Sequence, residues 1–519
     1  MAYAITQTCC TDATCVSVCP VNCIHPTPEE PGFATAELLH IDPEACIDCG
    51  ACADACPVDA IFPVDRLAGS LAGYGELNRQ YYRENPTDHA WGAPQFPRSA
   101  PDRVGTLRVA VVGTGPAAAY TAQTLLRAAG AEVTVLDRLP VAGGLLRHGV
   151  APDHQSTKRI GDGFAQLWHH PRLRLHLNVE VGRDLSHEEL AAHHDAVVYA
   201  VGAGRERRLG VPGEEVALPV STFVGWYNAE PTVPADAVDL SGERVVLIGN
   251  GNVALDVARI LVTDPDELAA TDIADHALAA LRAGRVREVV LLARRGPEHA
   301  AYTRPEFLAL RGLPGVAVVV DGEAGGRGDG KAALLDGLPH ERIDWREPPP
   351  AGRRIVLRFD APPVALRADG VELAGGELVP ADLVVRSIGY RGTPVPGLPY
   401  DEAAGTVAHR DGRVVPGVYV VGWAKRGPSG GIGSNRACAE QTVHALLDDA
   451  EAGLLTAPDG EPDAFARLVR RRRPEATGLR ELVAIDRAER ARGAALGRPR
   501  VKLASVPELL AAGRRFGRG

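Results

Sequence analysis

Membrane-length apolar runs, aromatic side chains and an excess of positive charge are all scarce or missing in this chain. No charge-free apolar run reaches about 18 residues, the length that a membrane-spanning helix needs, so no membrane span is expected. Aromatic residues make up only 5% of the chain, which argues against a stacking surface for single-stranded nucleic acid. The formal net charge of −10 argues against a general polyanion-binding role. We therefore expect a soluble protein that binds neither nucleic acid nor membrane.

Cysteine is nearly absent after residue 57. Nine of the ten cysteines lie before that point, and the tenth, Cys438, is expected to be a core residue. A secreted disulfide framework spreads its cysteines through the fold, and the initial MAYAITQTCC shows no signal peptide. The clustering indicates metal ligation in a reducing compartment, so we expect a cytoplasmic location.

The second half of the cysteine-rich region carries a complete cluster motif. Residues 46–57 read CIDCGACADACP, which is Cys-x2-Cys-x2-Cys-x3-Cys-Pro, the spacing of bacterial ferredoxins. In ferredoxins with two clusters, the last cysteine of each motif ligates the other cluster. The spacing therefore predicts one 4Fe-4S site with these ligands: Cys19, Cys46, Cys49 and Cys52.

The first half of the region is incomplete. Residues 9–20 read CCTDATCVSVCP, and Asp12 stands where the second thiolate belongs. The predicted thiolates of the second site are Cys9, Cys15 and Cys56. A carboxylate holds iron less firmly than a thiolate, so we expect a 3Fe-4S cluster or a labile 4Fe-4S cluster there. Ligation by Cys10 after a small backbone shift is the alternative.

A dinucleotide-binding pattern begins at residue 107. The apolar run LRVAVVGTG ends in Gly113-x-Gly115-x-x-Ala118, which follows a predicted strand and opens a predicted helix. Gly113 permits the tight turn, and Gly115 lets a pyrophosphate approach the amides at the start of the helix. Asp137 ends the next predicted strand, where it can accept hydrogen bonds from a ribose diol.

The same pattern returns at Gly249-x-Gly251-x-x-Ala254, with a different ending. Its second strand ends in Arg294 and Arg295, whose guanidinium groups can clamp a 2′-phosphate that a carboxylate would repel. The alternative is an exposed basic strand end. The contrast between the two pockets predicts FAD in the first and NADP(H) in the second. A flavin accepts hydride and releases electrons singly, as an iron–sulfur cluster requires.

These patterns predict an α/β protein with two Rossmann-like dinucleotide-binding domains of the glutathione-reductase type, preceded by a small α+β bacterial ferredoxin domain. The expected ferredoxin domain is 1–66, and the expected extended connector is 67–106. The expected FAD-binding domain combines 107–242 with 386–519, and the NADP-binding domain is 243–385.

The chain resembles ferredoxin–NADP reductases of the adrenodoxin-reductase type, with a fused seven- or eight-iron ferredoxin at its N-terminus. The motifs that carry the resemblance are VGTGPAAAYTA (112–122), GLLRHGVAPDH (144–154), GNGNVALDVAR (249–259), ARRGP (293–297), SIGYRG (387–392) and VGWAKRGPSGGIGSN (421–435). Seven-iron ferredoxins also place a non-ligand cysteine near Cys23, which we expect to be a buried free thiol.

The resemblance implies roles for individual residues. The implied FAD contacts are Ala117, Asp137, Leu145, Val181, Trp423, Gly430, Gly431 and Ile432. The implied NADP contacts are Gly249, Asn250, Gly251, Asn252, Val253, Arg294, Arg295 and Glu306. His154 and Glu306 are the catalytic candidates, because the family has polar residues there that tune proton and hydride movement near the flavin. A structural hydrogen bond is the alternative for His154, and a core position is the alternative for Trp423.

The resemblance implies a ferredoxin–NADP(+) reductase that moves electrons among NADPH, FAD and the clusters, with an external ferredoxin or haem protein as partner. The alternative is an electron-input subunit of a larger complex, similar to the small subunit of glutamate synthase. That protein arranges its cysteines differently, so the motifs favour the reductase.

Overall fold

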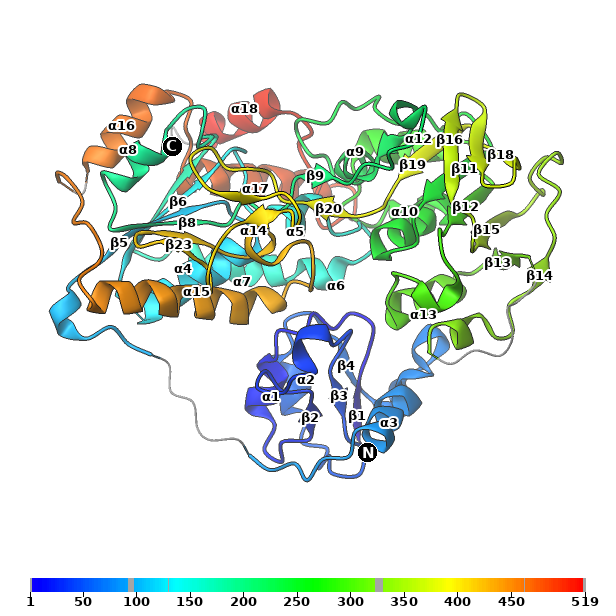
Figure 1. The fold of residues 1–519 in the computed structure, drawn as a ribbon, viewed down its shortest axis with the longest axis horizontal. Helices are drawn as coiled ribbons and strands as arrows, with labels where there is room; N and C mark the ends of the chain where they lie inside the picture. The colour runs from blue at the N-terminus through cyan, green and yellow to red at the C-terminus, as the bar shows by residue number, and fades with distance from the viewer. Residues whose placement is uncertain (1, 92–97, 129, 323–329, 462, 517–519) are drawn as a thin grey trace.

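Two largely parallel sheets and a small cysteine-rich module make up the protein (Figure 1). The computed structural model describes residues 2–91, 98–128, 130–322, 330–461 and 463–516. In Figure 1 the module, drawn in blue, lies beneath the helices of both larger units.

The first sheet has six strands in the order β23-β24-β8-β5-β6-β7. Its strands are β5 (Arg108–Val112), β6 (Glu132–Asp137), β7 (Leu173–Leu177), β8 (Ala196–Tyr199), β23 (Arg413–Val415) and β24 (Val418–Val420). The central strands are buried on both faces, which explains why they read as continuous apolar runs. Helices α4 (Pro116–Ala128) and α15 (Ser434–Glu451) share the core of one face, and α8 (His187–Ala191) and α16 (Ala464–Arg472) share that of the other.

The second sheet has seven strands in the order β10-β19-β11-β12-β15-β13-β14. Its strands are β10 (Leu218–Pro219), β11 (Arg244–Ile248), β12 (Glu288–Leu292), β13 (Val316–Asp321), β14 (His340–Glu341), β15 (Arg353–Arg358) and β19 (Leu383–Arg386). One face carries α9 (Val220–Tyr227), α10 (Asn252–Val262), α12 (Asp275–Ala283) and α13 (Arg304–Arg311). The other face carries the antiparallel sheet of β16 (Pro363–Arg367), β17 (Gly370–Leu373) and β18 (Leu378–Pro380).

The change from one sheet to the other lies earlier in the chain than the sequence indicates. Strand β10 pairs with β19, and α9 packs in the core of the second sheet, although both precede residue 243. The chain crosses between the sheets through a two-stranded ribbon of β9 (Arg205–Glu206) and β20 (Tyr390–Arg391).

The remaining elements of the larger units are short or peripheral. Around the first sheet they are α5 (Leu145–His148), α6 (Gln155–Lys158), α7 (Ile160–Leu167), α14 (Trp423–Arg426), α17 (Leu479–Ala494) and α18 (Val506–Phe516). The others are α11 (Pro265–Leu268) and the pair β21 (Tyr400–Asp401) and β22 (Thr406–Val407). Lys158 of α6 and Lys502, between α17 and α18, supply polar side chains that meet the second unit, as described below.

The cysteine-rich module is built from two similar halves. The first half contributes α1 (Thr14–Val18) and β2 (Ile24–His25), and the second contributes α2 (Ala51–Ala55) and β4 (Ile61–Pro63). Strand β1 (Tyr3–Ile5) pairs with β4, and β2 pairs with β3 (His40–Ile41). Each short helix ends at the crossing cysteine, Cys19 or Cys56, whose amide donates to the carbonyl three residues back.

The segment 67–106 is not an extended connector throughout, which corrects the expectation from sequence. It contains α3 (Tyr74–Glu84), which packs on the module. The buried Asn78 side chain accepts from the amides of Ile5 and Ile41, and the Tyr82 hydroxyl donates to backbone carbonyls of β3 and Cys23. Further along, Arg98 forms ion pairs with two acids of α15, each at 2.6 Å. The module therefore includes α3, and the chain after it is fastened to the first unit.

Candidate functional site

The thiols of the predicted complete cluster site line one hollow in the module. Cys19, Cys46, Cys49 and Cys52 all face this hollow, together with apolar side chains of β2 and β3. Cys23 is buried beside them, with its Sγ 3.5 Å from that of Cys19. Four thiols around one hollow fit a 4Fe-4S cluster, which needs four thiolate ligands.

The residues of the incomplete site also lie together. Burial raises the pKa of the Cys9 thiol to about 11, and nearby Cys56 and Asp12 add to the increase. Burial likewise raises the pKa of Cys15, beside Cys9 and Asp12. Thiols of this kind ionise only when a metal ion supplies compensating charge, which is how metal binding couples to proton release. The Thr14 hydroxyl donates a hydrogen bond to the Asp12 carboxylate.

The two halves of the module keep the same backbone although their ligand sets differ. Left-handed residues occur at equivalent positions: Thr11 and Asp48, Ala13 and Gly50, Asn22 and Asp59. Asp12 therefore takes the place that Cys49 holds in the other half. The Cys10 thiol also lies near Cys9, Cys56 and Asp12, so both side chains stay within the group of residues around this corner.

The first dinucleotide loop has the geometry that its glycines predict. Gly113 adopts φ +116°, and a Cβ there would lie 2.5 Å from the Ala200 carbonyl oxygen. A Cβ on Gly115 would meet nothing within 4 Å, so the space beside this residue is open to a pyrophosphate. Asp137 ends β6 beside this loop and accepts from the Thr114 hydroxyl at 2.6 Å. Burial raises the pKa of Asp137.

The second dinucleotide loop repeats this turn on the other sheet. Gly249 adopts φ +119°, and a Cβ there would lie 2.0 Å from the Ser387 carbonyl oxygen. Asn252 exchanges hydrogen bonds with Thr303, which holds the loop against the segment before α13. The buried Nδ2 of Asn250 has no hydrogen-bond partner. An unpaired buried donor at a glycine-rich loop fits a nucleotide phosphate.

Arg294 and Arg295 follow β12 at the same edge of the sheet as this loop. Both are exposed, and neither guanidinium has an ion-pair partner among the described residues. Two free cations beside a dinucleotide loop suit an additional phosphate, such as the 2′-phosphate of NADP.

The predicted flavin contacts surround the first loop. Leu145 is 49% exposed, which is unusual for a large apolar side chain and fits an aromatic cofactor face. Trp423 is partly buried and stacks near Tyr390, with ring centroids 6.2 Å apart. A Cβ on Gly422 would lie 2.6 Å from the Ala117 Cβ, so α14 closes tightly on α4. Val181 lies in the turn after β7, close to Asp137, because the amide of Val179 donates to the Asp137 carbonyl oxygen at 2.8 Å.

The catalytic candidates meet in a cluster that joins both units. His154 and Glu306 lie with Asp256 so that one ligand atom of each falls within 4.8 Å of the others. Arg259, which sequence reasoning did not single out, lies at the centre of this cluster with a nearly buried side chain. Its guanidinium contacts Asp153 of the first unit, Asp256 at 2.6 Å and Glu306 at 3.6 Å. The Asp-x-x-Arg spacing on α10 was the one sequence signal for it.

The contact with Arg259 indicates one tautomer for a neutral His154 ring. Its Nε2 lies 2.9 Å from an Arg259 nitrogen, and a guanidinium can only donate. The His154 proton therefore resides on Nδ1. Burial and nearby Asp256 raise the pKa of Glu306, so this side chain keeps its proton to a higher pH than an exposed glutamate does.

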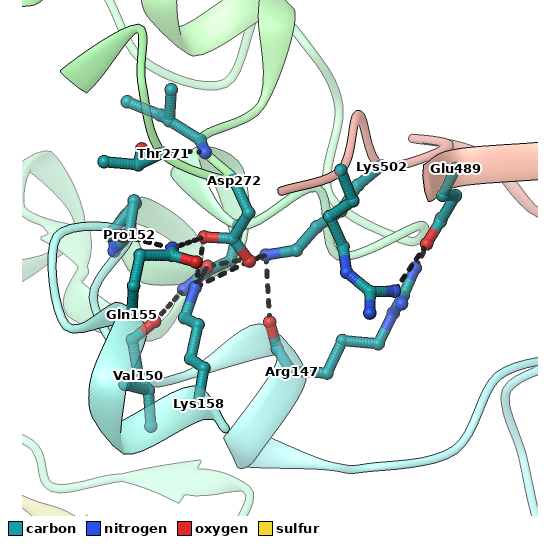
Figure 2. A network of polar contacts seen from close by, with 12 residues as sticks. Arg147, Val150, Pro152, Gln155, Lys158, Thr271, Asp272, Glu489 and Lys502 are labelled. Carbon is teal, nitrogen blue, oxygen red and sulfur yellow. Dashed lines mark hydrogen bonds and ion pairs between the residues drawn. The ribbon is translucent and has the colours of Figure 1, made fainter. Parts of the chain in front are cut away.

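A second buried polar network also joins the two units, next to this cluster (Figure 2). Asp272 of the second unit pairs with Lys158 at 2.7 Å and with Lys502 at 2.8 Å. Asn228 accepts from both lysines at 3.0 Å. Arg147 pairs with the fully buried Glu489 of α17 on the edge of the network. Burial lowers the pKa of Lys502, and the two lysines lower that of Asp272.

Dinucleotide loops on two separate sheets, one closed by a carboxylate and one by guanidiniums, define a two-nucleotide flavoprotein oxidoreductase. A family model for pyridine nucleotide-disulphide oxidoreductases matches residues 107–295, and one for 4Fe-4S binding domains matches residues 39–62. The chain belongs to the ferredoxin–NADP reductase family, in the form that carries an N-terminal iron–sulfur domain.

Similar proteins establish this membership. The chain is 49% identical to a probable ferredoxin/ferredoxin–NADP reductase of Mycobacterium tuberculosis, over 99% of this chain and 95% of the relative. It is 37% identical to the human mitochondrial NADPH:adrenodoxin oxidoreductase, over 81% and 95%. The solved structure of M. tuberculosis FprA in complex with NADPH is 40% identical, with a TM-score of 0.71, and covers 79% of this chain and 100% of that one.

These findings confirm the predicted α/β fold class and the FAD-dependent oxidoreductase activity, with FAD, NADP(H) and a 4Fe-4S cluster as cofactors. They also favour the reductase over the electron-input subunit. In the part of the chain that the structure describes, no helix is both long and apolar enough to cross a bilayer.

Proposed function

We propose that this reductase carries electrons from NADPH through FAD to the cysteine-rich module, and from there to an external ferredoxin or haem protein. We place it in the cytoplasm, where thiolate ligands stay reduced. The ferredoxin domain then extends from the N-terminus through α3. The FAD-binding domain is the unit of the first sheet, and the NADP-binding domain is the unit of the second.

The second cluster of the module is proposed to be a 3Fe-4S or labile 4Fe-4S cluster. Cys9, Cys15 and Cys56 supply its thiolates, and Asp12 stands at the fourth corner. The support is the backbone repeat described above, which leaves a carboxylate where the other half has Cys49.

The residues near the hydride path act by positioning. When bound, the flavin accepts two electrons together as hydride from NADPH and gives them up one at a time. Asn250, Asn252, Arg294 and Arg295 hold the NADP phosphates at the start of α10. Arg259, further along the same helix, binds Asp153 and orients His154 on the FAD-binding side. These contacts fix the NADP-binding domain against the FAD-binding domain at this point, and such alignment would be the main requirement for a direct hydride transfer.

The observation that carries the nucleotide assignment is the pair of free guanidiniums beside the unpaired Asn250 amide. The double variant Arg294→Ala/Arg295→Ala tests it through the KM for NADPH and for NADH. Because both arginines are exposed, we take about 1.5–3 kcal/mol for the whole clamp, so its loss should raise the KM for NADPH roughly 10- to 100-fold. The KM for NADH should change little, because NADH lacks the 2′-phosphate.

The matched control is Arg287→Ala/Arg342→Ala, which removes two exposed arginines of the same domain. Arg287 precedes β12, at the opposite end of the strand from Arg294. This control should leave both KM values near those of the unmodified protein. An equal rise for NADPH and NADH in the first variant would reject the 2′-phosphate assignment.

A further inference from the structure

The module and the FAD-binding domain share one continuous apolar core. Leu146 and Ile160 of the FAD-binding domain are 5% and 6% exposed and are buried among side chains of the module. Phe164 and Ile432 pack against the same cluster. Contacts of this kind give the module a defined docking position, or seat, on the FAD-binding domain.

At this seat, the proposed flavin loop touches the incomplete cysteine motif through the backbone. The amide of Gly433 donates a hydrogen bond of 2.9 Å to the carbonyl oxygen of Cys10. Gly433 directly follows the proposed flavin contacts 430–432. Cys10 lies between Cys9 and Asp12, two members of the incomplete ligand set.

The local backbone does not require a glycine at position 433. Its φ of −66° and ψ of −32° are open to any residue. The requirement is steric, because a Cβ there would lie 2.3 Å from the Asp12 amide nitrogen and 2.4 Å from the Cys10 carbonyl oxygen. Both neighbours are backbone atoms, so no side chain can turn aside to make room.

A second contact fastens the same corner of the module. Arg436, on the first turn of α15, has its Nη1 3.3 Å from the Thr14 hydroxyl oxygen and 3.4 Å from the Asp12 carbonyl oxygen. Thr14 in turn donates to the Asp12 carboxylate. The FAD-binding domain therefore presents a cation to the one corner where a carboxylate replaces a thiolate.

The complete cluster site lies differently with respect to solvent. Cys49 is exposed, and Ile47, two residues before it, is 59% exposed, whereas Asp12, at the equivalent position of the incomplete site, is only partly exposed. The complete site therefore has a ligand at the solvent boundary, where an external electron carrier can approach it.

We propose that Gly433 is a positioning residue that seats the incomplete cysteine motif against the flavin loop. This motif is therefore the flavin side of the module. The complete motif, with Ile47 beside it, is the side that meets an external one-electron carrier. The inference rests on the proposed electron path and adds the order of the two sites along it.

The variant Gly433→Ala tests this seat, because its methyl group forces the Cys10–Asp12 backbone away. In the oxidised protein without NADPH, the amide of residue 433 should exchange hydrogen faster, as it loses its acceptor. Low-temperature EPR should show an altered signal for the Cys9–Cys15–Cys56 site and an unaltered one, after dithionite, for the Cys19–Cys46–Cys49–Cys52 site. After mixing with NADPH, bleaching of the cluster absorbance should slow relative to flavin bleaching in the same experiment, because the incomplete motif is moved away from the flavin loop.

Two further variants keep the result interpretable. Gly163→Ala adds a methyl group in α7 where nothing lies within 4 Å, and it should match the unmodified protein in all three measurements. Arg436→Ala removes the contacts to Thr14 and Asp12 without adding bulk. If Gly433→Ala fails to retain its iron, the same three measurements are made on Arg436→Ala. We expect smaller changes in the same directions for this variant.

The proposal is overturned if Gly433→Ala shows normal exchange at residue 433 and a normal signal from the incomplete site. It is also overturned if only the signal of the complete site changes. Failure of the proposed electron path is a separate result, because NADPH would then leave the module oxidised even in the unmodified protein.

Discussion

The FAD-binding domain meets its two neighbours through interfaces of opposite chemistry. Toward the NADP-binding domain it presents buried charges, with Lys158 and Lys502 on Asp272, and Asp153 on Arg259. Toward the module it presents mainly apolar side chains, with one backbone hydrogen bond, the contacts of Arg436 and an exposed ion pair of Arg159 at the rim.

The difference matches what each neighbour must do. Hydride transfer requires two rings at a separation of about 3–3.5 Å with aligned orbitals, so small displacements are costly. Charge-assisted hydrogen bonds are directional and fix such a geometry. Single electrons pass without such contact, so a well-packed apolar seat is sufficient for the module.

The largest expected effect comes from removing the carboxylate that pairs with both lysines of the network in Figure 2. Asp272→Asn leaves two buried lysines without their counter-charge, which should destabilise the interface by about 3–5 kcal/mol. Denaturant unfolding followed by flavin fluorescence measures it. Asp266→Asn, which breaks an exposed pair with Arg282, should stay within about 0.5 kcal/mol. If Asp272→Asn and Asp266→Asn unfolded at similar denaturant concentrations, the interface would not depend on charge.

A somewhat smaller effect is expected from a cavity in the apolar interface. Ile160→Ala removes a buried side chain that packs on the module, at an expected cost of about 2–4 kcal/mol. The module should loosen while the two sheets remain folded, so hydrogen exchange should become faster at residues 9–15 before it does in the strands of the two sheets. Val415→Ala, at a side chain that is 53% exposed, is the control. If the module and the two domains became unfolded together, the module would not open independently.

The charged interface can be weakened without removing its charge. Arg259→Lys keeps a cation but cannot contact Asp153, Asp256 and His154 together, because an ammonium lacks the planar fork. We expect the rate of flavin reduction at saturating NADPH to fall about tenfold, with little change in NADP binding. Stopped-flow absorbance measures the first and calorimetry the second. Arg282→Lys is the exposed control, and an unchanged rate for Arg259→Lys would exclude a positioning role.

The smallest effect is expected at the rim of the module. Arg159 and Asp59 form an ion pair across this interface, with side chains 57% and 52% exposed. Asp59→Asn should change the stability of the seat by less than about 0.5 kcal/mol, because exposed pairs are screened by water and salt. Hydrogen exchange of residues 9–15 measures it. If Asp59→Asn changed the hydrogen exchange of these residues as much as Ile160→Ala does, ion pairing and not apolar packing would hold the module.

The sequence was sufficient for the elements whose signal is local. Buried parallel strands read as apolar runs, and the glycine turns after β5 and β11 follow from their spacing. Helix α3 was missed because its attachment uses Asn78 and Tyr82, whose partners lie far away in the chain. Helix α9 carries Phe223, Trp226 and Tyr227, which are all fully buried. Such a helix shows no preferred face, so its sequence cannot tell which sheet it packs on.

The same limit applies to the candidate site. The cysteine spacing predicts ligand sets that the structure brings together, because most of the ligands lie within short motifs. Arg259 and Asp153, in contrast, are joined only by folding, as are Lys502 and Asp272. No spacing rule connects residues on different domains. Gly433 resembles any other glycine of its loop until the neighbouring backbone is visible.

The anchoring of Arg98 on α15 limits how far the module can travel. Only the residues between α3 and Arg98 link them, and such a segment reaches about 45 Å when fully extended. A dislodged module therefore stays at a local concentration in the millimolar range. We therefore expect a free ferredoxin at micromolar levels to compete poorly for the docking position on the FAD-binding domain. The covalent link thus favours electron transfer from the flavin to the attached module.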